Sequence, residues 1–275
     1  MHQLLYKDIV TAALKEDLGF GDLTTETIFA DQEGKAEIMA RERGIAAGLA
    51  VAAEAFAQVD PRIVFTPSLN DGDNFAPGDV LAVLHGPLAG ILTAERVALN
   101  FLQRLSGIAT ATGNAVNAVR GTGVKILDTR KTTPGLRVLE KYAVRTGGGE
   151  NHRYNLSDLV LIKDNHIHGA GSISEAVARV RKRRGFAAKI EVEAATLKDV
   201  KEALECGVEI IMLDNMDTSQ MAEAVKIIAG RALIEASGAI RQEQLQKVAA
   251  TGVDYISLGS LTHSCRALDL SLNLL

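Results

Sequence analysis

Charged and small residues follow a series of short apolar runs in the second half of the chain. The runs are VKILDT, LVLIKDN, AKIEVEA, EIIMLDN, ALIEAS and YISLGS, and the residues at or just past their ends are Arg130, Lys131, Lys163, Asp164, Glu193, Asp214, Ser237, Gly238 and Gly259. One polar residue at such a place is as easily a strand ending as a functional group. Six successive runs that end on polar or small residues favour a functional role over ordinary strand endings. Lys163 and Glu193 stand inside apolar runs, where isolated ions are costly to bury, so we expect them to be partly buried and to face each other or a charged ligand.

The chemical character of these residues changes along the chain. The first two runs supply cations, the next two supply carboxylates, and the last two supply small residues. Glu193 and Asp214 could hold a divalent ion or stabilise positive charge that develops on a sugar. The glycines of SGAI and GSL suit a phosphate held on backbone N–H groups, although each alone could be an ordinary turn. The pattern predicts a site for a phosphorylated sugar beside a strongly anionic second substrate.

The segment between the first two runs is rich in cations. From residue 125 to 168 the chain has 8 Lys and Arg against 5 Asp and Glu, although its net charge is −4. We interpret TRKTTPGLRVLEKYAVRTGGGENHRYNL as a loop segment without helical spacing, and its cationic groups are Arg130, Lys131, Arg137, Lys141, Arg145, His152 and Arg153. Arg binds planar carboxylates through two parallel hydrogen bonds, which suits a flat dicarboxylic acid. We interpret GGG at 147–149 as a flexible turn, since no GKS or GKT follows it, and we expect a structural role for His166.

A parallel α/β fold must position these residues. The six apolar runs are short and rich in β-branched residues, which predicts strands. Segments with helical spacing follow at 196–206, 218–229 and 241–250, and Gly207, Gly230 and Gly252 are their expected C-terminal stops. Repeated strand–helix units without an early GxGxxG turn favour an incomplete, TIM-like parallel α/β barrel, whose site lies at the carboxyl ends of the strands.

The first part of the chain has a different pattern, which predicts a separate α+β sandwich domain. We expect a helix at 4–17, strands at 35–42, 63–69 and 79–86, and an amphipathic connecting helix at 93–110. We place the domain boundary after residue 110. The N-terminal domain is then 1–110 and the catalytic barrel 111–275, whose last residues could pack back on the N-terminal domain.

Composition argues against several classes of protein. Of the 275 residues, 47% are hydrophobic and 23% are charged, as in ordinary globular proteins. Net charge argues against a general nucleic-acid surface. Charged residues interrupt the first twenty positions, and the apolar stretch 44–59 is too short to cross a bilayer. We therefore expect a cytoplasmic protein without nucleic-acid or membrane partners, and the spacing of Cys206 and Cys265 suggests neither a disulfide nor a zinc site.

Several motifs resemble those of one known family. DTRKTTPGLRVLEKYAV, GGGENHRYNLSDLVLIKDNHI, KIEVE, IMLDNM, EASG and GVDYISLGSLTHS resemble quinolinate phosphoribosyltransferases in order, spacing and identity. EDLGFGDLTT and ERVALNFLQRLSGIAT extend the resemblance over nearly the whole chain. It implies a carboxylating nicotinate-nucleotide pyrophosphorylase, which makes nicotinate mononucleotide, pyrophosphate and CO2 from quinolinate and phosphoribosyl pyrophosphate in de novo NAD biosynthesis, with Mg²⁺ as cofactor.

The resemblance also implies a homodimer or higher oligomer, in which the N-terminal domain of one subunit covers the barrel mouth of the other. The groups implied to hold the two quinolinate carboxylates are Arg130, His152, Arg153, Lys163 and, across the interface, Arg96. Thr129 is implied to bind substrate. The groups implied to meet the phosphoribosyl substrate are Lys131, Glu193, Asp214, Ser237, Gly238, Ala239, Gly259 and Ser260, the last five at the terminal phosphate. Lys131, Glu193 and Asp214 are the implied catalytic residues. Glu193 and Asp214 would face the ribose and hold Mg²⁺ directly, or through substrate or water.

One departure from the family and several alternatives remain. Ala239 stands where the family usually has a second glycine, and its methyl group is tolerable unless the residue needs a positive φ. The alternatives are a molybdenum-transport-associated homologue of the same fold, a phosphoribosyltransferase for a monocarboxylic base, an anion-binding barrel without this activity, and a barrel whose charges only pair internally. LIKDNHI resembles the quinolinate enzymes more than the molybdenum-associated relative.

Overall fold

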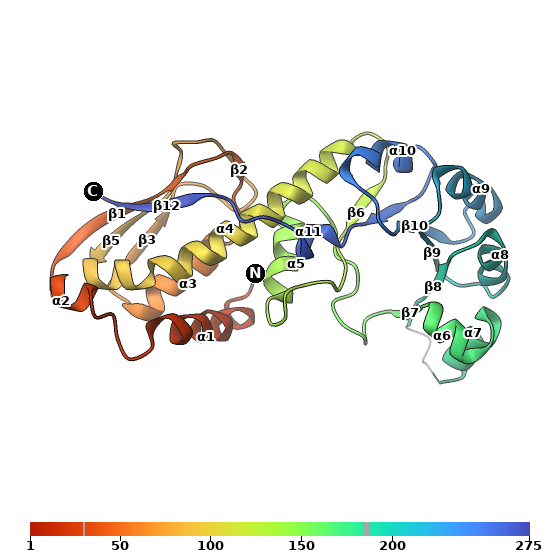
Figure 1. Ribbon diagram of the computed structural model, residues 1–275, viewed down its shortest axis with the longest axis horizontal. Helices are drawn as coiled ribbons and strands as arrows, with labels where there is room; N and C mark the ends of the chain where they lie inside the picture. The colour runs from red at the N-terminus through yellow and green to blue at the C-terminus, as the bar shows by residue number, and fades with distance from the viewer. Residues whose placement is uncertain (30, 184–187) are drawn as a thin grey trace. The chain divides into compact units, whose positions relative to one another are not determined.

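The computed structural model describes residues 1–29, 31–183 and 188–275, which form two compact units of α/β structure (Figure 1). Unit 1 contains Met1–Gly113, Thr132–Gly148 and Ser260–Leu275, and unit 2 contains Asn114–Lys131 and Gly149–Gly259. The sequence therefore passes between the units several times. Among the described helices, none is both long and apolar enough to cross a membrane.

Unit 2 is built on a six-stranded parallel sheet. Its strands are β6 (Lys125–Leu127), β7 (Val160–Ile162), β8 (Ile190–Ala194), β9 (Ile210–Asp214), β10 (Leu233–Ser237) and β11 (Tyr255–Ser257), and their order is β6-β11-β10-β9-β8-β7. Each of the six apolar runs contains one of them, as predicted. Strands β7 to β11 follow one another, and β6 lies beside the last of them, which is the order of a barrel opened between β6 and β7. The prediction of an incomplete parallel barrel is confirmed.

Helices connect the strands of unit 2. They are α6 (Asp164–Ala170), α7 (Ile173–Arg183), α8 (Leu197–Glu205), α9 (Thr218–Ile228), a 3₁₀ turn η2 (Gln242–Gln244) and α10 (Leu245–Ala249). Figure 1 shows α7, α8 and α9 side by side along the sheet. Thr196 and Asp217 cap α8 and α9 by accepting from backbone N–H groups. The predicted stops Gly207, Gly230 and Gly252 all have positive φ, as helix-ending glycines often do.

Unit 1 contains an antiparallel sheet in the order β12-β1-β5-β3. These strands are β1 (Glu33–Ala40), β3 (Val64–Pro67), β5 (Val80–Pro87) and β12 (Leu270–Leu274), and a smaller sheet pairs β2 (Gly44–Ile45) with β4 (Asn74–Phe75). The three predicted strands of the N-terminal part are confirmed. The fourth, β12, comes from the far end of the sequence and pairs with β1 through residues 270–274.

The helices of unit 1 bury much of its apolar surface. They are η1 (Gln3–Leu5), α1 (Lys7–Leu18), α2 (Thr25–Phe29), α3 (Leu49–Val59), α5 (Arg137–Thr146), α11 (Ser260–His263) and the first part of α4 (Leu88–Ala118). The predicted connecting helix is confirmed within α4, whose Ala94, Val97 and Ala98 are buried. Gly107 lets the chain at Arg266 come close to α4, because a Cβ at Gly107 would overlap the Arg266 carbonyl.

Candidate active site

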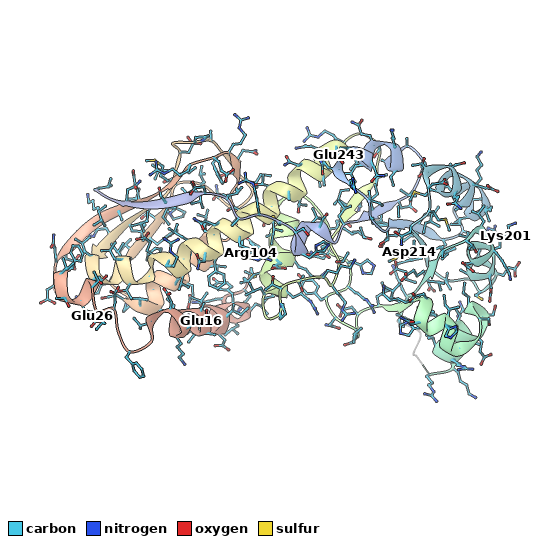
Figure 2. The ribbon with its side chains drawn as sticks, in the orientation of Figure 1. Glu16, Glu26, Arg104, Lys201, Asp214 and Glu243 are labelled. Atoms are coloured by element: carbon cyan, nitrogen blue, oxygen red, sulfur yellow. The ribbon has the colours of Figure 1, made fainter. Side chains whose placement is uncertain are left out.

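Strand register places acidic and small residues of unit 2 on one face of its sheet. Glu193 of β8 lies opposite Met212 of β9, and two positions further along β9 Asp214 lies opposite Ser237. Side chains alternate between the two faces of a strand, so residues in register and residues two positions apart share a face. The polar residues of this face are Glu191, Glu193, Asp214, Glu235 and Ser237. Asp214 is the last residue of β9 (Figure 2). The carboxyl ends of neighbouring strands thus bring the predicted groups together.

Lys163 and Glu193 face each other at this end of the sheet. The Lys163 Nζ lies 3.0 Å from Glu193 Oε2, which confirms that the two charges meet. The Glu193 side chain is 13% exposed, as expected for a partly buried group, but that of Lys163 is 46% exposed. The expected burial of Lys163 is wrong because β7 ends at Ile162, which leaves Lys163 in the loop before α6. There His166 Nδ1 accepts from the Lys163 N–H at 2.9 Å, consistent with the structural role predicted for His166.

Gly238 and Ala239 form a tight turn after β10. Gly238 has a φ of +124°, a conformation that favours glycine. Among the described residues other than glycine, positive φ occurs only at Asn215 and Ala229, so Ala239 does not need the freedom of a glycine. Because residue 239 does not need a positive φ, the backbone tolerates the Ala239 methyl group. The Ala239 N–H donates to Asn215 Oδ1 at 3.3 Å.

A buried cluster of His152, Glu191 and Glu235 lies on the same face of the sheet. His152 Nε2 lies 3.0 Å from Glu191 Oε2 and 3.3 Å from Glu235 Oε2. The carboxylates are 0% and 2% exposed, respectively. Neither Glu191 nor Glu235 was predicted from the sequence. The available signal was their position two residues before Glu193 and Ser237, as carboxylates inside apolar strands that share the functional face.

The buried carboxylates change the acid–base properties of the cluster. Burial lowers the pKa of His152, but the hydrogen bonds and charges of Glu191 and Glu235 outweigh it and raise this pKa to about 10. Burial also raises the pKa of Glu191. The Arg153 N–H donates to His152 Nδ1 at 2.8 Å, which favours a ring with its hydrogen on Nε2. His152 and Glu191 face each other and both have raised pKa values, so the additional proton belongs to this pair rather than to one group.

The cationic loop around His152 is held by Asp128. This buried carboxylate follows β6 and accepts from the His152 N–H at 2.9 Å and from Asn151 Nδ2. The Arg153 Nη1 donates to the Leu159 carbonyl at 3.1 Å. Burial, followed by the nearby charge of Arg130, lowers the pKa of Arg153. Two guanidinium groups close enough to repel each other form a suitable site for an anion.

Several predicted residues are placed outside this loop. Arg137, Lys141 and Arg145 lie at every fourth position of α5 in unit 1, so the interpretation of this segment as a loop without helical spacing is wrong. Gly147 packs against α4, because a Cβ there would overlap the Ala109 carbonyl, and Gly148 has a positive φ. Arg96 and Ser260 also belong to unit 1, whereas Thr129, Lys131 and Gly259 belong to unit 2. The roles predicted for these five residues remain predictions.

The acidic residues offer two different sets of metal ligands. Among residues 1–29, 31–183 and 188–275, the one group of three close His, Cys, Asp or Glu ligand atoms comes from His152, Glu191 and Glu235. These ligand atoms already pair with one another, His152 with both Glu191 and Glu235. Glu193 and Asp214 offer carboxylate oxygens, the ligands that Mg²⁺ prefers, but they lie outside any such group of three. A Mg²⁺ held there would complete its coordination with substrate oxygens or water.

Comparison with known proteins confirms the resemblance drawn from the motifs. The family model of the quinolinate phosphoribosyl transferase C-terminal domain matches residues 108–273, and that of the N-terminal domain matches residues 22–106. The chain is 47% identical over 273 residues to a probable carboxylating nicotinate-nucleotide pyrophosphorylase of Bacillus subtilis (strain 168), covering 99% of this chain and 94% of the relative. It is 44% identical to the decarboxylating quinolinate phosphoribosyltransferase 1b of Nicotiana tabacum, covering 98% and 82%. The crystal structure of NadC from Streptococcus pyogenes superimposes with a TM-score of 0.96 at 44% identity, covering 100% of this chain and 99% of that one.

Proposed function

Since the chain belongs to the quinolinate phosphoribosyl transferase family, we propose that it is a carboxylating nicotinate-nucleotide pyrophosphorylase of de novo NAD biosynthesis. It converts quinolinate and phosphoribosyl pyrophosphate into nicotinate mononucleotide, pyrophosphate and CO2. The observation that carries this proposal is the arrangement of unit 2. Clustered cations follow its first two strands, and Glu193 and Asp214 stand on one face at the ends of the next two.

The cations bind the dicarboxylic acid. Arg130 and Arg153 are close enough to repel each other, so an anion between them removes that repulsion. Their planar guanidinium groups match the two carboxylates of quinolinate. Lys163 adds a flexible ammonium group, and its pairing with Glu193 holds it at the same end of the sheet. The resemblance implied that His152 binds a carboxylate as well, but its ring nitrogens face Glu191, Glu235 and the Arg153 N–H, so we assign it instead the role of fixing the Arg153 backbone.

The carboxylates act on the phosphoribosyl group. The pyridine nitrogen of quinolinate forms a bond to the ribose carbon while the bond to pyrophosphate breaks, and positive charge develops on the sugar ring. Glu193 and Asp214 stabilise that charge, and Lys131 meets phosphoryl oxygens. The bond from ring carbon C2 to its carboxylate then breaks as CO2 leaves. The electron pair stays on C2 beside the positively charged nitrogen, and C2 takes up a proton from water to give nicotinate mononucleotide. Decarboxylation therefore needs no separate base.

A magnesium ion and a second subunit belong to the same proposal. Mg²⁺ supplies charge neutralisation to the departing pyrophosphate, and Glu193 and Asp214 are the residues that would hold it, directly or through water. The terminal phosphate is bound by Ser237, Gly238, Ala239, Gly259 and Ser260. In a homodimer or higher oligomer, Arg96 of one subunit reaches the quinolinate site of another. We also place the protein in the cytoplasm.

A product assay tests the proposed reaction. The purified protein is incubated with quinolinate, phosphoribosyl pyrophosphate and Mg²⁺, and nicotinate mononucleotide is followed by mass spectrometry. We expect product with quinolinate and none when nicotinate replaces it. Product from nicotinate would favour an enzyme for a monocarboxylic base. Absence of product with both acids would contradict the proposal and favour an anion-binding protein of the same fold.

A further inference from the structure

We propose that Asn215 is a positioning residue that fixes Asp214 and the turn at 237–239 in one arrangement for the phosphoribosyl substrate. This inference rests on the proposed function. It assigns a role to a residue that touches neither substrate in the scheme above. Asn215 directly follows β9, so it stands between the carboxylate proposed to face the ribose and the turn proposed to bind the phosphate.

Three hydrogen bonds connect Asn215 to both sides. Its Nδ2 donates to Asp214 Oδ2 at 2.9 Å. Its Oδ1 accepts from the Ala239 N–H at 3.3 Å, and its backbone N–H donates to the Ser237 carbonyl at 3.0 Å. An amide side chain has both a donor and an acceptor, which these contacts require. A rotation of the Asp214 carboxylate or a shift of the turn would break at least one of the three bonds.

Backbone geometry supports the same assignment. Asn215 has a φ of +53°, in the left-handed region that Asn enters more readily than most residues. Gly238 has a φ of +124°, and a Cβ at this position would overlap Asn215 Oδ1 and Cγ. The Asn215 amide therefore occupies the space that glycine leaves open. The turn and the amide are matched in shape as well as in hydrogen bonding.

Asn215→Asp isolates the donor at Nδ2. Aspartate has nearly the same shape and can still accept from the Ala239 N–H, but it places a second carboxylate against Asp214. We expect the KM for phosphoribosyl pyrophosphate to rise about tenfold or more, as for the loss of a hydrogen bond to a charged group, while the KM for quinolinate stays within about twofold. We expect kcat to fall as well, because Asp214 loses its orientation. A merely structural role would not separate the two KM values.

Two glycine variants separate the side chain from the backbone. Asn215→Gly keeps the left-handed conformation and removes both side-chain hydrogen bonds, so it should show the same split between the KM values. Ala229→Gly is the matched control, because Ala229 has a φ of +49° at the end of α9 and no role in the scheme. Ala229→Gly should retain wild-type kinetics.

The outcomes distinguish this inference from the proposed function. If the wild-type protein forms no product, the proposed reaction itself is contradicted. With an active wild-type protein, unchanged kinetics in Asn215→Asp and Asn215→Gly overturn the positioning role. Equal increases in both KM values also overturn it. If Asn215→Gly fails to fold, as judged by its thermal unfolding curve, Asn215→Asp still decides the question.

Discussion

At the scale of single residues, the proposed reaction depends most on the carboxylates at the ends of β8 and β9. Glu193 and Asp214 occupy adjacent strands on the same face, so their charges act on the same small volume. Fixed charges aimed at a developing opposite charge are among the largest contributions to catalysis. Their removal should therefore affect turnover more than folding.

Glu193→Ala and Asp214→Ala should each lower kcat by about 10²-fold or more, the scale of a lost preorganised electrostatic group. Steady-state assays with saturating quinolinate and phosphoribosyl pyrophosphate measure the effect. Glu223→Ala, which removes an exposed carboxylate from α9, is the control and should keep wild-type turnover. Near-normal kcat in both single variants would refute the electrostatic role.

The His152 cluster predicts a pH dependence of stability. Its proton is bound more tightly in the folded protein than in the unfolded chain, because the pKa of His152 is raised to about 10 and that of Glu191 is also raised. The folded state therefore holds more protons between neutral pH and about pH 10, and stability must fall as pH rises through this range. Burial also raises the pKa of Cys265 from 9.0 to about 11 and that of Tyr142 from 10.0 to about 12, so Cys265 adds to the loss of stability above about pH 9 and Tyr142 above about pH 10.

Urea unfolding between pH 7 and pH 10 should show this loss in the wild-type protein. Glu191→Gln should flatten the profile, because the neutral amide removes one of the charges that retain the proton. Glu223→Gln, at an exposed position, should keep the wild-type slope. Identical pH profiles for the wild type and Glu191→Gln would show that the cluster does not retain an additional proton.

Residue chemistry was predictable where a single strand carried the signal. Lys163 and Glu193 were identified because charges inside apolar runs need partners, and the ion pair confirms that argument. Glu191, Glu235 and Asn215 were missed because their partners come from distant segments. His152 is brought to the carboxylates by the loop held on Asp128, and Asn215 meets a turn that follows another strand. The hydrophobic pattern along a single strand cannot show either of these contacts between distant segments.

At the scale of elements, α4 and α5 are joined by an ion pair whose carboxylate is buried. Arg104 projects from α4 (Figure 2), and its Nε donates to Glu140 Oε1 of α5 at 2.9 Å. Arg104 also donates to Thr133 Oγ1 at 2.7 Å, and the Thr133 N–H donates to Glu140 Oε2 at 3.1 Å. Glu140 is 0% exposed, so Arg104 and the Thr133 N–H provide the hydrogen bonds that water cannot reach to make.

Arg104→Met should lower the free energy of unfolding by about 3–5 kcal/mol, because it leaves a buried carboxylate without its cation. The double variant Arg104→Met/Glu140→Leu should recover part of the loss, since it removes the unpaired charge together with its former partner. Equilibrium urea unfolding measures both. Equal stability of the single variant and the wild type would mean that water or another cation replaces Arg104.

Two glycines in helices should respond oppositely to alanine. Gly107→Ala should destabilise the protein despite the higher helix propensity of alanine, because its Cβ would overlap the Arg266 carbonyl. Gly169→Ala in α6 meets no atom within 4 Å and should gain up to about 1 kcal/mol from helix propensity. Thermal unfolding of the two variants gives the comparison. A gain in stability for Gly107→Ala would contradict the close packing of α4 at this point.

Elements with a clear period were predicted well. All six strands of unit 2 lie within the apolar runs, and the amphipathic stretch at 93–110 lies within α4. Helix α5 was missed because its cations were interpreted as ligand-binding groups of a loop, although they recur every fourth residue. The predicted helix at 241–250 begins as a 3₁₀ turn, a distinction that depends on local hydrogen bonding rather than on hydrophobic spacing.

At the scale of the whole molecule, the proposed oligomer predicts that Arg96 acts in the site of a neighbouring subunit. Arg96→Ala and Lys163→Ala should each be nearly inactive, because each removes a cation proposed to bind quinolinate. Subunits of the two variants, mixed, unfolded and refolded together, should regain about one quarter of wild-type activity, since half of randomly paired dimers then contain one intact site. No recovery would place Arg96 in its own subunit's site or outside the site altogether.

The pairing of β12 with β1 has a consequence for synthesis on the ribosome. Arg41, just after β1, bonds Ser271 of β12 across 230 positions of sequence, so the sheet of unit 1 lacks a strand until nearly all of the chain has been made. Most of unit 2 comes from the continuous stretch Gly149–Gly259, which is translated earlier. The nascent chain therefore carries β1 as an open edge, able to pair with other strands, while the later unit is still emerging. Ribosome-bound chains stalled before β12 has emerged should therefore bind chaperones more strongly than chains extended by a C-terminal linker that brings residues 270–274 out of the exit tunnel.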